Sequence, residues 1–176
     1  MTKVDAMYSK FETFEEQLAH CYFVLHERFI TNPPVARFWA EVAMDELQHS
    51  AILRFCRERG LTVTDYEVAP GMIEHIDDLL DTAKDITNDP EVTIDEAFYA
   101  SLLMESSELD NIYEKLTAAL AKDHLLLYQA IHANLRGHYD NFADGVDEFS
   151  GDKGLAEAFR AFGKAEKRSL QERTAS

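Results

Sequence analysis

The sequence predicts an all-α protein, an antiparallel four-helix bundle with a short connecting helix and a C-terminal helix. Apolar residues recur at intervals of three and four along nearly the whole chain, whereas the alternation typical of strands is almost absent. Only 7 Gly and 4 Pro occur among 176 residues, which favours long uninterrupted helices over turn-dense β architectures. With 46% hydrophobic residues, the chain can bury a core of its own.

The first part of the chain predicts two helices joined by a tight turn. Helical periodicity begins near residue 7 and is interrupted by Asn-Pro-Pro at 32–34, where proline suits the first turn of the next helix. That second helix is expected over 35–59, because Gly60 is a typical residue to cap a helix C-terminus. These two segments are expected to pack as an antiparallel hairpin.

The middle of the chain predicts a shorter helix and the start of another long one. After a connector at 61–69, Pro70-Gly71 begins an acidic helix expected to end near residue 86. Thr93 and Glu96 then form a capping box, in which each side chain binds the free backbone N–H of the other residue. The helix that begins there is expected to reach residue 121.

The last part of the chain predicts one further long helix and a helical tail. The long helix is expected over 123–145, and helical spacing resumes after Gly151. We therefore assign residues 1–150 to the helical bundle and residues 151–176 to a C-terminal helical tail.

The composition excludes several classes of function. The chain has 17 Lys and Arg against 33 Asp and Glu, and its net charge of -16 repels nucleic-acid phosphates and anionic lipid. We therefore expect neither a nucleic acid nor a membrane as partner. Cys21 and Cys56 are the only cysteines, too few for a disulfide scaffold or a four-thiolate metal site. Without an apolar leader or a membrane-spanning run, the expected location is the cytoplasm.

The most informative motif is Glu46-Leu-Gln-His49 in the second helix. Glu46 and His49 are three residues apart and share one helix face with the apolar Val42 and Leu53. A carboxylate and an imidazole directed at a core need a strong compensating interaction. A bound metal ion supplies one, and an inward Glu-x-x-His is the ligand unit of di-iron carboxylate bundles.

An approximate internal repeat strengthens this interpretation. Glu16 precedes His49 by 33 residues, and Glu105 precedes His138 by the same interval. The apolar residues around His138 also follow the spacing of those around His49. The sequence therefore predicts two copies of one helical hairpin, each presenting Glu on its first helix and His on its second.

Several of these residues allow a second interpretation. Glu15 competes with Glu16, because the repeat favours Glu16 whereas the stripe of apolar residues in the first helix favours Glu15. The pair Glu46 and His49 could be a buried ion pair that serves packing, and His138 could be a core histidine bonded to a carboxylate such as Glu46. Tyr22 and Tyr113 are either hydrogen-bond donors near the site or packing aromatics.

These motifs resemble the rubrerythrin branch of the ferritin-like superfamily, over roughly residues 11–59 and 95–146. The segment 15–22 is similar to that family's first-helix Glu followed by Tyr, and Glu46 with His49 matches its Glu-x-x-His. The segment 105–113 is similar to its Glu-x-x-Glu with a downstream Tyr. The resemblance implies a ferritin-like bundle that holds two irons and reduces peroxide or dioxygen, or oxidises ferrous iron.

The resemblance also implies a ligand set and a cofactor. The ligand set comprises four carboxylates and two imidazoles, and this mixed oxygen and nitrogen environment suits iron and also manganese. The four carboxylates would balance the four positive charges of two ferrous ions. A small redox donor protein would be the expected electron source. The expected metal ligands are Glu16, Glu46, His49, Glu105, Glu108 and His138.

Two departures from the family pattern open an alternative function. The second Glu-x-x-His is replaced by Leu135-Arg-Gly-His138, and the family's four-cysteine rubredoxin-like domain does not occur. Leu135 removes one expected ligand. The alternative is therefore a non-enzymatic helical bundle whose metal site has degenerated and which serves in assembly or binding.

The sequence also predicts self-association. Trp39, Phe23 and Tyr99 lie outside the apolar stripes assigned to the core. Large aromatic residues in excess of one core indicate a second buried surface, and we expect a homodimer.

Overall fold

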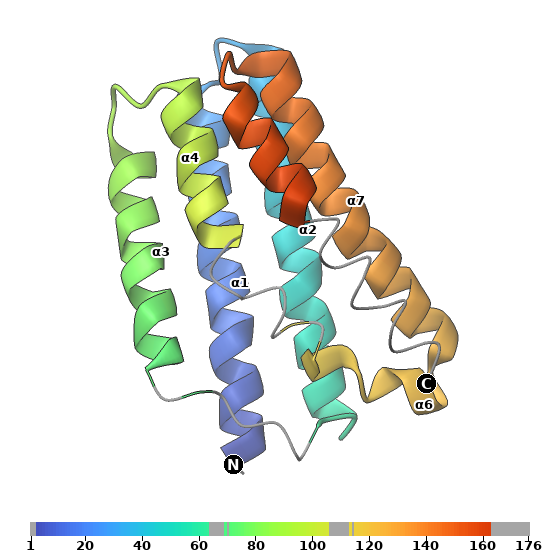
Figure 1. Ribbon diagram of the computed structural model, residues 1–176. Helices are drawn as coiled ribbons and strands as arrows, with labels where there is room; N and C mark the ends of the chain where they lie inside the picture. Colours follow the sequence, from blue (N-terminus) through green and yellow to red (C-terminus); the bar gives the residue numbers. More distant parts are fainter. Residues whose placement is uncertain (1–2, 64–68, 70, 106–112, 114, 163–176) are drawn as a thin grey trace.

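The computed structural model of the chain describes residues 3–63, 69, 71–105, 113 and 115–162. All regular elements within these ranges are helices, and no strand occurs among them, which confirms the all-α prediction. The long helices run up and down along a common long axis (Figure 1).

The first two helices form a long hairpin. Helix α1 spans Lys3–Arg28 and α2 spans Pro33–Glu58, and the two pack against each other along most of their length (Figure 1). The prolines predicted for the first turn of α2 are found there. Gly60 follows the helix at φ 66°, and the Leu61 N–H donates to the Cys56 carbonyl oxygen, as in a glycine-terminated helix.

The next two helices also form a hairpin. Helix α3 spans Met72–Asn88 and α4 spans Ile94–Glu105. The predicted capping box precedes α4: the Thr93 N–H donates to Glu96 Oε2 at 2.9 Å, and the Glu96 N–H donates to Thr93 Oγ1 at 3.2 Å. The start of α4 therefore follows the local signal in the sequence.

The second half of the chain departs from the predicted boundaries. The helix expected to reach residue 121 is interrupted by a turn at 118–119. A short helix α6, Leu120–Asp123, follows that turn, and α7 then spans Leu125–Phe149. Residues 153–162 are helical and lie beside the end of α7 (Figure 1).

One core joins these elements. Phe38 and Trp39 from α2 contact Phe98 from α4 and Phe142 from α7, with ring centroids between 5.0 and 6.5 Å apart. Phe159, in the helix at 153–162, stacks on Phe142 at 4.7 Å, so this helix packs on the same core. The placement of Trp39 outside the core was wrong: its side chain is fully buried, because it fills the space between Tyr22 and the aromatic rings.

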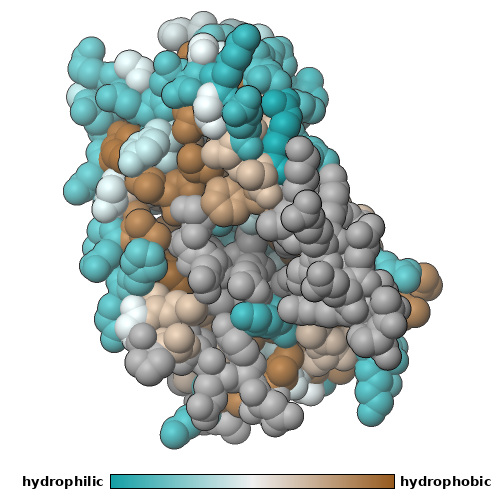
Figure 2. Space-filling model, in the orientation of Figure 1, coloured by the Kyte–Doolittle hydropathy of each residue, from teal (hydrophilic) through white to brown (hydrophobic). Residues whose placement is uncertain are grey.

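The surface that the structure describes is mainly hydrophilic. Figure 2 shows hydrophilic side chains over the end of the molecule where α7 finishes, and hydrophobic ones gathered over α4. Among the described residues, no helix has the length and apolar composition needed to cross a membrane.

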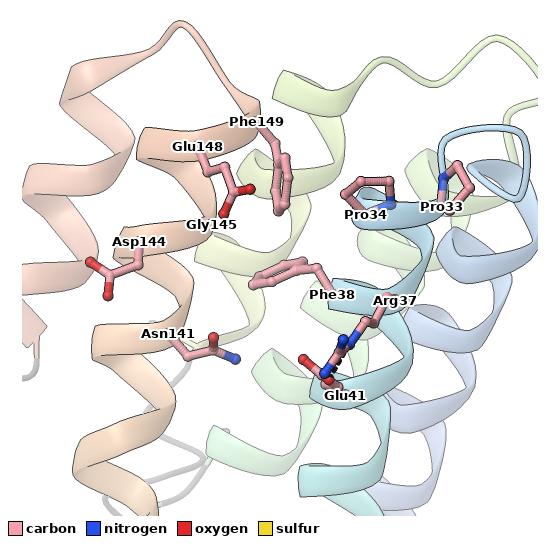
Figure 3. A pocket seen from close by; sticks show the side chains of 10 residues that line it. All are labelled: Pro33, Pro34, Arg37, Phe38, Glu41, Asn141, Asp144, Gly145, Glu148 and Phe149. Atoms are coloured by element: carbon pink, nitrogen blue, oxygen red, sulfur yellow. Dashed lines mark hydrogen bonds and ion pairs between the residues drawn. The ribbon is translucent and has the colours of Figure 1, made fainter.

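A close approach between α2 and α7 depends on glycine. Gly145 is buried, and a Cβ atom built there would lie 2.5 Å from Cε2 of Phe38. In Figure 3 the Phe38 ring extends from α2 toward α7 beside this position. Rings on both sides hold Phe38 in place, including Phe98 at 5.4 Å and Phe149 at 5.9 Å. Position 145 therefore cannot accept a side chain without moving an aromatic cluster.

We expect Gly145→Ala to lower the free energy of unfolding by about 1–3 kcal/mol, because the added methyl group overpacks the Phe38 contact. Gly137→Ala is the matched control in the same helix, where nothing lies within 4 Å of the added atom. That control should raise stability by up to about 1 kcal/mol through helix propensity. Urea unfolding measures both, and equal effects would contradict this account of Gly145.

Candidate metal centre

Five ionisable side chains from four helices meet inside the apolar core. Glu15 comes from α1, Glu46 and His49 from α2, Glu105 from the end of α4, and His138 from α7. Each has at most 4% of its surface exposed. Ionisable side chains are almost never buried this deeply unless they are paired or bind a ligand.

Local helix geometry explains why these residues face inward. Glu15 lies on the same stripe of α1 as the buried Phe11, Leu18 and Tyr22. Glu46 and His49 are one turn apart on the buried face of α2, as the sequence predicts. The apolar residues thus orient the helices, and the polar ones follow because they share the same faces.

The five side chains form two overlapping groups with the spacing of metal ligands. Glu15, Glu46 and His49 make one group, and Glu46, Glu105 and His138 make the other. Within each group, one ligand atom per residue lies within 4.8 Å of the others. Glu46 belongs to both groups, so its two carboxylate oxygens connect them.

The distances in the two groups are similar. His49 Nδ1 lies 3.0 Å from Glu46 Oε2 and 3.7 Å from Glu15 Oε2. His138 Nε2 lies 3.2 Å from Glu46 Oε1 and 3.4 Å from Glu105 Oε2. Each imidazole therefore directs one nitrogen between two carboxylates.

The other nitrogen of each imidazole meets an oxygen outside the cluster. Nε2 of His49 lies 3.3 Å from Oδ1 of Asn134, and Nδ1 of His138 lies 3.4 Å from Oδ2 of Asp45. Such partners fix the orientation of a ring and determine which nitrogen is available as a ligand. The sequence motifs contain no signal for Asp45 or Asn134, because each depends on the packing of α2 against α7.

Two tyrosines complete the surroundings. Tyr22 donates a hydrogen bond of 2.7 Å to Oε1 of Glu105, and its ring stacks on Trp39. The ring of Tyr113 lies 4.7 Å from that of His49. Of the two roles considered from the sequence, Tyr22 therefore is a hydrogen-bond donor at the site as well as a core aromatic.

The choice of Glu16 over Glu15 was wrong. The Glu16 side chain is 47% exposed and pairs with Arg54 and Ser50 on the surface between α1 and α2. Residues one position apart on a helix point about 100° away from each other, so only one of the pair can face inward. The interval of 33 residues between Glu and His predicted the wrong residue because the connections within the two hairpins differ. The apolar stripe of the first helix, in contrast, indicates directly which of its side chains face the core.

The remaining predicted ligands are placed as follows. Glu46, His49, Glu105 and His138 are brought together, as expected. Glu108 lies outside the described residues. Leu135, one turn before His138, is fully buried in the core.

The buried charges shift one another's pKa in a consistent direction. Burial raises the pKa of Glu46, but His138 and His49 outweigh it and hold that pKa well below its ordinary value. Burial lowers the pKa of His49, yet Glu46 and Glu15 raise it well above 6.5. Burial likewise lowers the pKa of His138, and Glu105, Glu46 and Asp45 raise it well above 6.5. Without metal, these shifts favour an ionised Glu46 and protonated imidazoles at His49 and His138.

The donor set fits metal ions. No Lys or Arg occurs among the buried polar side chains that the structure describes. Oε1 of Glu46 and Nε2 of His138 face each other at 3.2 Å but form no well-directed hydrogen bond. Carboxylate oxygens and imidazole nitrogens together suit iron, manganese or zinc.

An open groove of about 490 Å³ lies elsewhere, between the first turns of α2 and the last turns of α7 (Figure 3). Its lining includes Phe38, Phe149 and the ion pair of Arg37 with Glu41. No member of the cluster contributes to it.

Comparison of the chain with family models, with curated proteins and with solved structures finds no match.

We expect the stability of the metal-free protein to depend on pH through His49. Its pKa is raised in the folded state, so folding is favoured fully below pH 6.5, and this contribution is lost as pH rises through the raised pKa. The difference in unfolding free energy between the parent and His49→Gln should therefore shrink with increasing pH. Denaturant titrations in chelator measure it, with exposed His75→Gln as a control that should change stability little. A difference that grows with pH would contradict the assignment.

Proposed function

We propose that this protein is a ferritin-like four-helix bundle that binds two divalent metal ions, iron or manganese, and is similar in function to rubrerythrins. The observation that carries the proposal is the orientation of the two buried imidazoles. Each directs one nitrogen at a pair of carboxylates and the other at an oxygen acceptor, Asn134 or Asp45. Histidines that bind metals have this arrangement, because the outer acceptor fixes the ring and its tautomer.

Each residue of the cluster has a role in this proposal. Glu15 and His49 would hold one ion, Glu105 and His138 would hold the other, and Glu46 would contact both. Because the raised pKa values of His49 and His138 favour protonated imidazoles, binding of metal at these nitrogens would release protons. Tyr22 keeps Glu105 in position through its hydrogen bond.

Two ferrous ions would supply two electrons, the number needed to reduce hydrogen peroxide to water. The protein's own contribution is to keep bulk water out and to fix the ligands. The aromatic rings of Trp39 and Phe142 line this interior, and Tyr22 packs against both. We therefore propose an oxidoreductase that acts on peroxide or dioxygen, or a protein that oxidises ferrous iron.

One observation favours the alternative, a metal-free bundle that serves in assembly. Leu135 lies in the core where the family pattern has a ligand, and the three carboxylates that the structure describes at the site balance only three of the four positive charges of two ferrous ions. In that case the protonated imidazoles described above would be the permanent state of the cluster.

The two functions differ in how metal affects stability. We expect ferrous iron, added without oxygen at about a hundredfold excess over its dissociation constant, to stabilise the parent by ~2.7 kcal/mol per site. Glu15→Gln should lose about half of the total effect, because it removes an inward ligand from one of the two sites. Glu16→Gln is the matched control on the neighbouring residue and should keep it. Thermal melts with and without iron measure the effect, and equal behaviour of the two variants would exclude the proposed ligand set.

A substitution at Leu135 separates the two functions further. In a two-metal centre, Leu135→Glu adds a carboxylate one turn from His138 and should increase the iron-dependent stabilisation. In a metal-free bundle, the same change places an unpaired carboxylate in the core and should cost ~3 kcal/mol or more. Melts with and without ferrous iron measure both signs. If neither the parent nor the variant responds to iron or manganese, the metal-binding proposal fails.

A further inference from the structure

We propose that two copies of this chain associate through the outward face of α2, antiparallel to each other and around a twofold axis. The interface consists of an apolar stripe along that helix, which we call the α2 stripe. This inference does not depend on metal binding. The α2 stripe comprises Ala40, Met44, Leu47, Ala51 and Phe55.

The α2 stripe is unusually exposed for its composition. Met44 is 58% exposed, and Leu47 and Phe55 are each 38% exposed. The residues of the α2 stripe recur at intervals of three and four, so they lie along one side of the helix. Three of the large exposed hydrophobic residues of the described chain therefore fall on one line of a single helix.

The opposite side of α2 is already apolar. Val42 and Leu53 are fully buried in the core, so α2 carries hydrophobic residues both inward and outward. Helix α3 provides the contrast, because Ile76 and Leu80 face inward whereas its outward face carries acidic residues such as Asp81. A helix that is apolar on both sides is expected to be covered on both sides.

Nothing within the described chain covers the α2 stripe. One flank of α2 faces α1, where Arg54 pairs with Glu16. The other flank faces α7, where Asp45 meets His138. The α2 stripe lies between these flanks and points to solvent.

Charge favours a second copy as the occupant of this surface. With a net charge of -16, two chains repel each other wherever acidic surfaces meet. Between Glu41 and Glu58, the exposed positions of α2 carry no acidic residue: they hold the uncharged Met44, Leu47, Gln48, Ala51 and Phe55, together with Arg54, which pairs with Glu16. This segment is therefore a surface on which two such chains can approach without charge repulsion.

The α2 stripe is also complementary to itself. In one antiparallel register, small residues meet large ones and opposite charges meet at both ends. The twofold axis makes each contact occur twice. The expected pairs between the two copies are Arg37 with Glu58, Ala40 with Phe55, Met44 with Ala51, and Leu47 with Gln48.

We expect light scattering to give twice the chain mass of 20.1 kDa. The chain concentration should be about 100 µM, at which a dimer interface of standard size is occupied. Leu47→Glu should give a monomer, because it places two like charges beside the twofold axis. Leu126→Glu is the matched control: Leu126 is 82% exposed at the corner where α6 meets α7, and the dimer should persist. Circular dichroism confirms that each variant is folded.

Charge exchange tests the register itself. Arg37→Glu and Glu58→Arg should each weaken the dimer about tenfold, because each replaces two attractive contacts by two repulsive ones. The double variant should regain the parent affinity, since the pairs are restored with reversed signs. A monomeric parent, a dimer that survives Leu47→Glu, or a double variant no tighter than the single ones would each overturn the proposal.

Discussion

The burial of three carboxylates and two imidazoles in one apolar interior is the constraint on which the other features of this protein depend. Moving a single unpaired charge out of water costs several kcal/mol even after the protein relaxes. Here Glu15, Glu46 and Glu105 are all at most 4% exposed, and the described core offers them no Lys or Arg. Within the described cluster, positive charge can come from protons on His49 and His138, which offset two of the three carboxylates, or from metal ions in their place.

The helices are arranged so that this cluster is held from four sides. The ligand-bearing faces of α1, α2, α4 and α7 are also the apolar faces that drive packing. Outside the cluster, Asp45 and Asn134 hold the two rings, and Tyr22 holds Glu105. A metal-bound imidazole and a protonated one both use a partner at each ring nitrogen. The sharing of Glu46 between two groups with the spacing of metal ligands is what favours a metal centre over a structural ion pair.

Much of this arrangement could be predicted from sequence because it depends on local rules. The capping box at Thr93 and the glycine after α2 are short-range signals, and both are found as expected. The inward direction of Glu46 and His49 follows from helix periodicity.

The errors came from relations over longer distances. The internal repeat favoured Glu16, but an interval that spans two helices depends on the length and shape of the turn between them. The apolar stripe through Phe11 and Leu18 lies within one helix and correctly indicates which side faces the core. Trp39 seemed to lie outside the core because four helices converge there, which a single-helix pattern does not include. The contact of Asp45 with His138 depends on the packing of α2 against α7, so no spacing rule in the sequence indicates it.

The central claim is that the cluster binds two metal ions that share Glu46. Anomalous diffraction at the iron edge, from crystals of protein loaded with ferrous iron without oxygen, tests this most directly. The account predicts two peaks, one among Glu15, Glu46 and His49 and one among Glu46, Glu105 and His138. If crystals of folded, iron-treated protein lack an anomalous peak at one or both of these positions, the claim is contradicted.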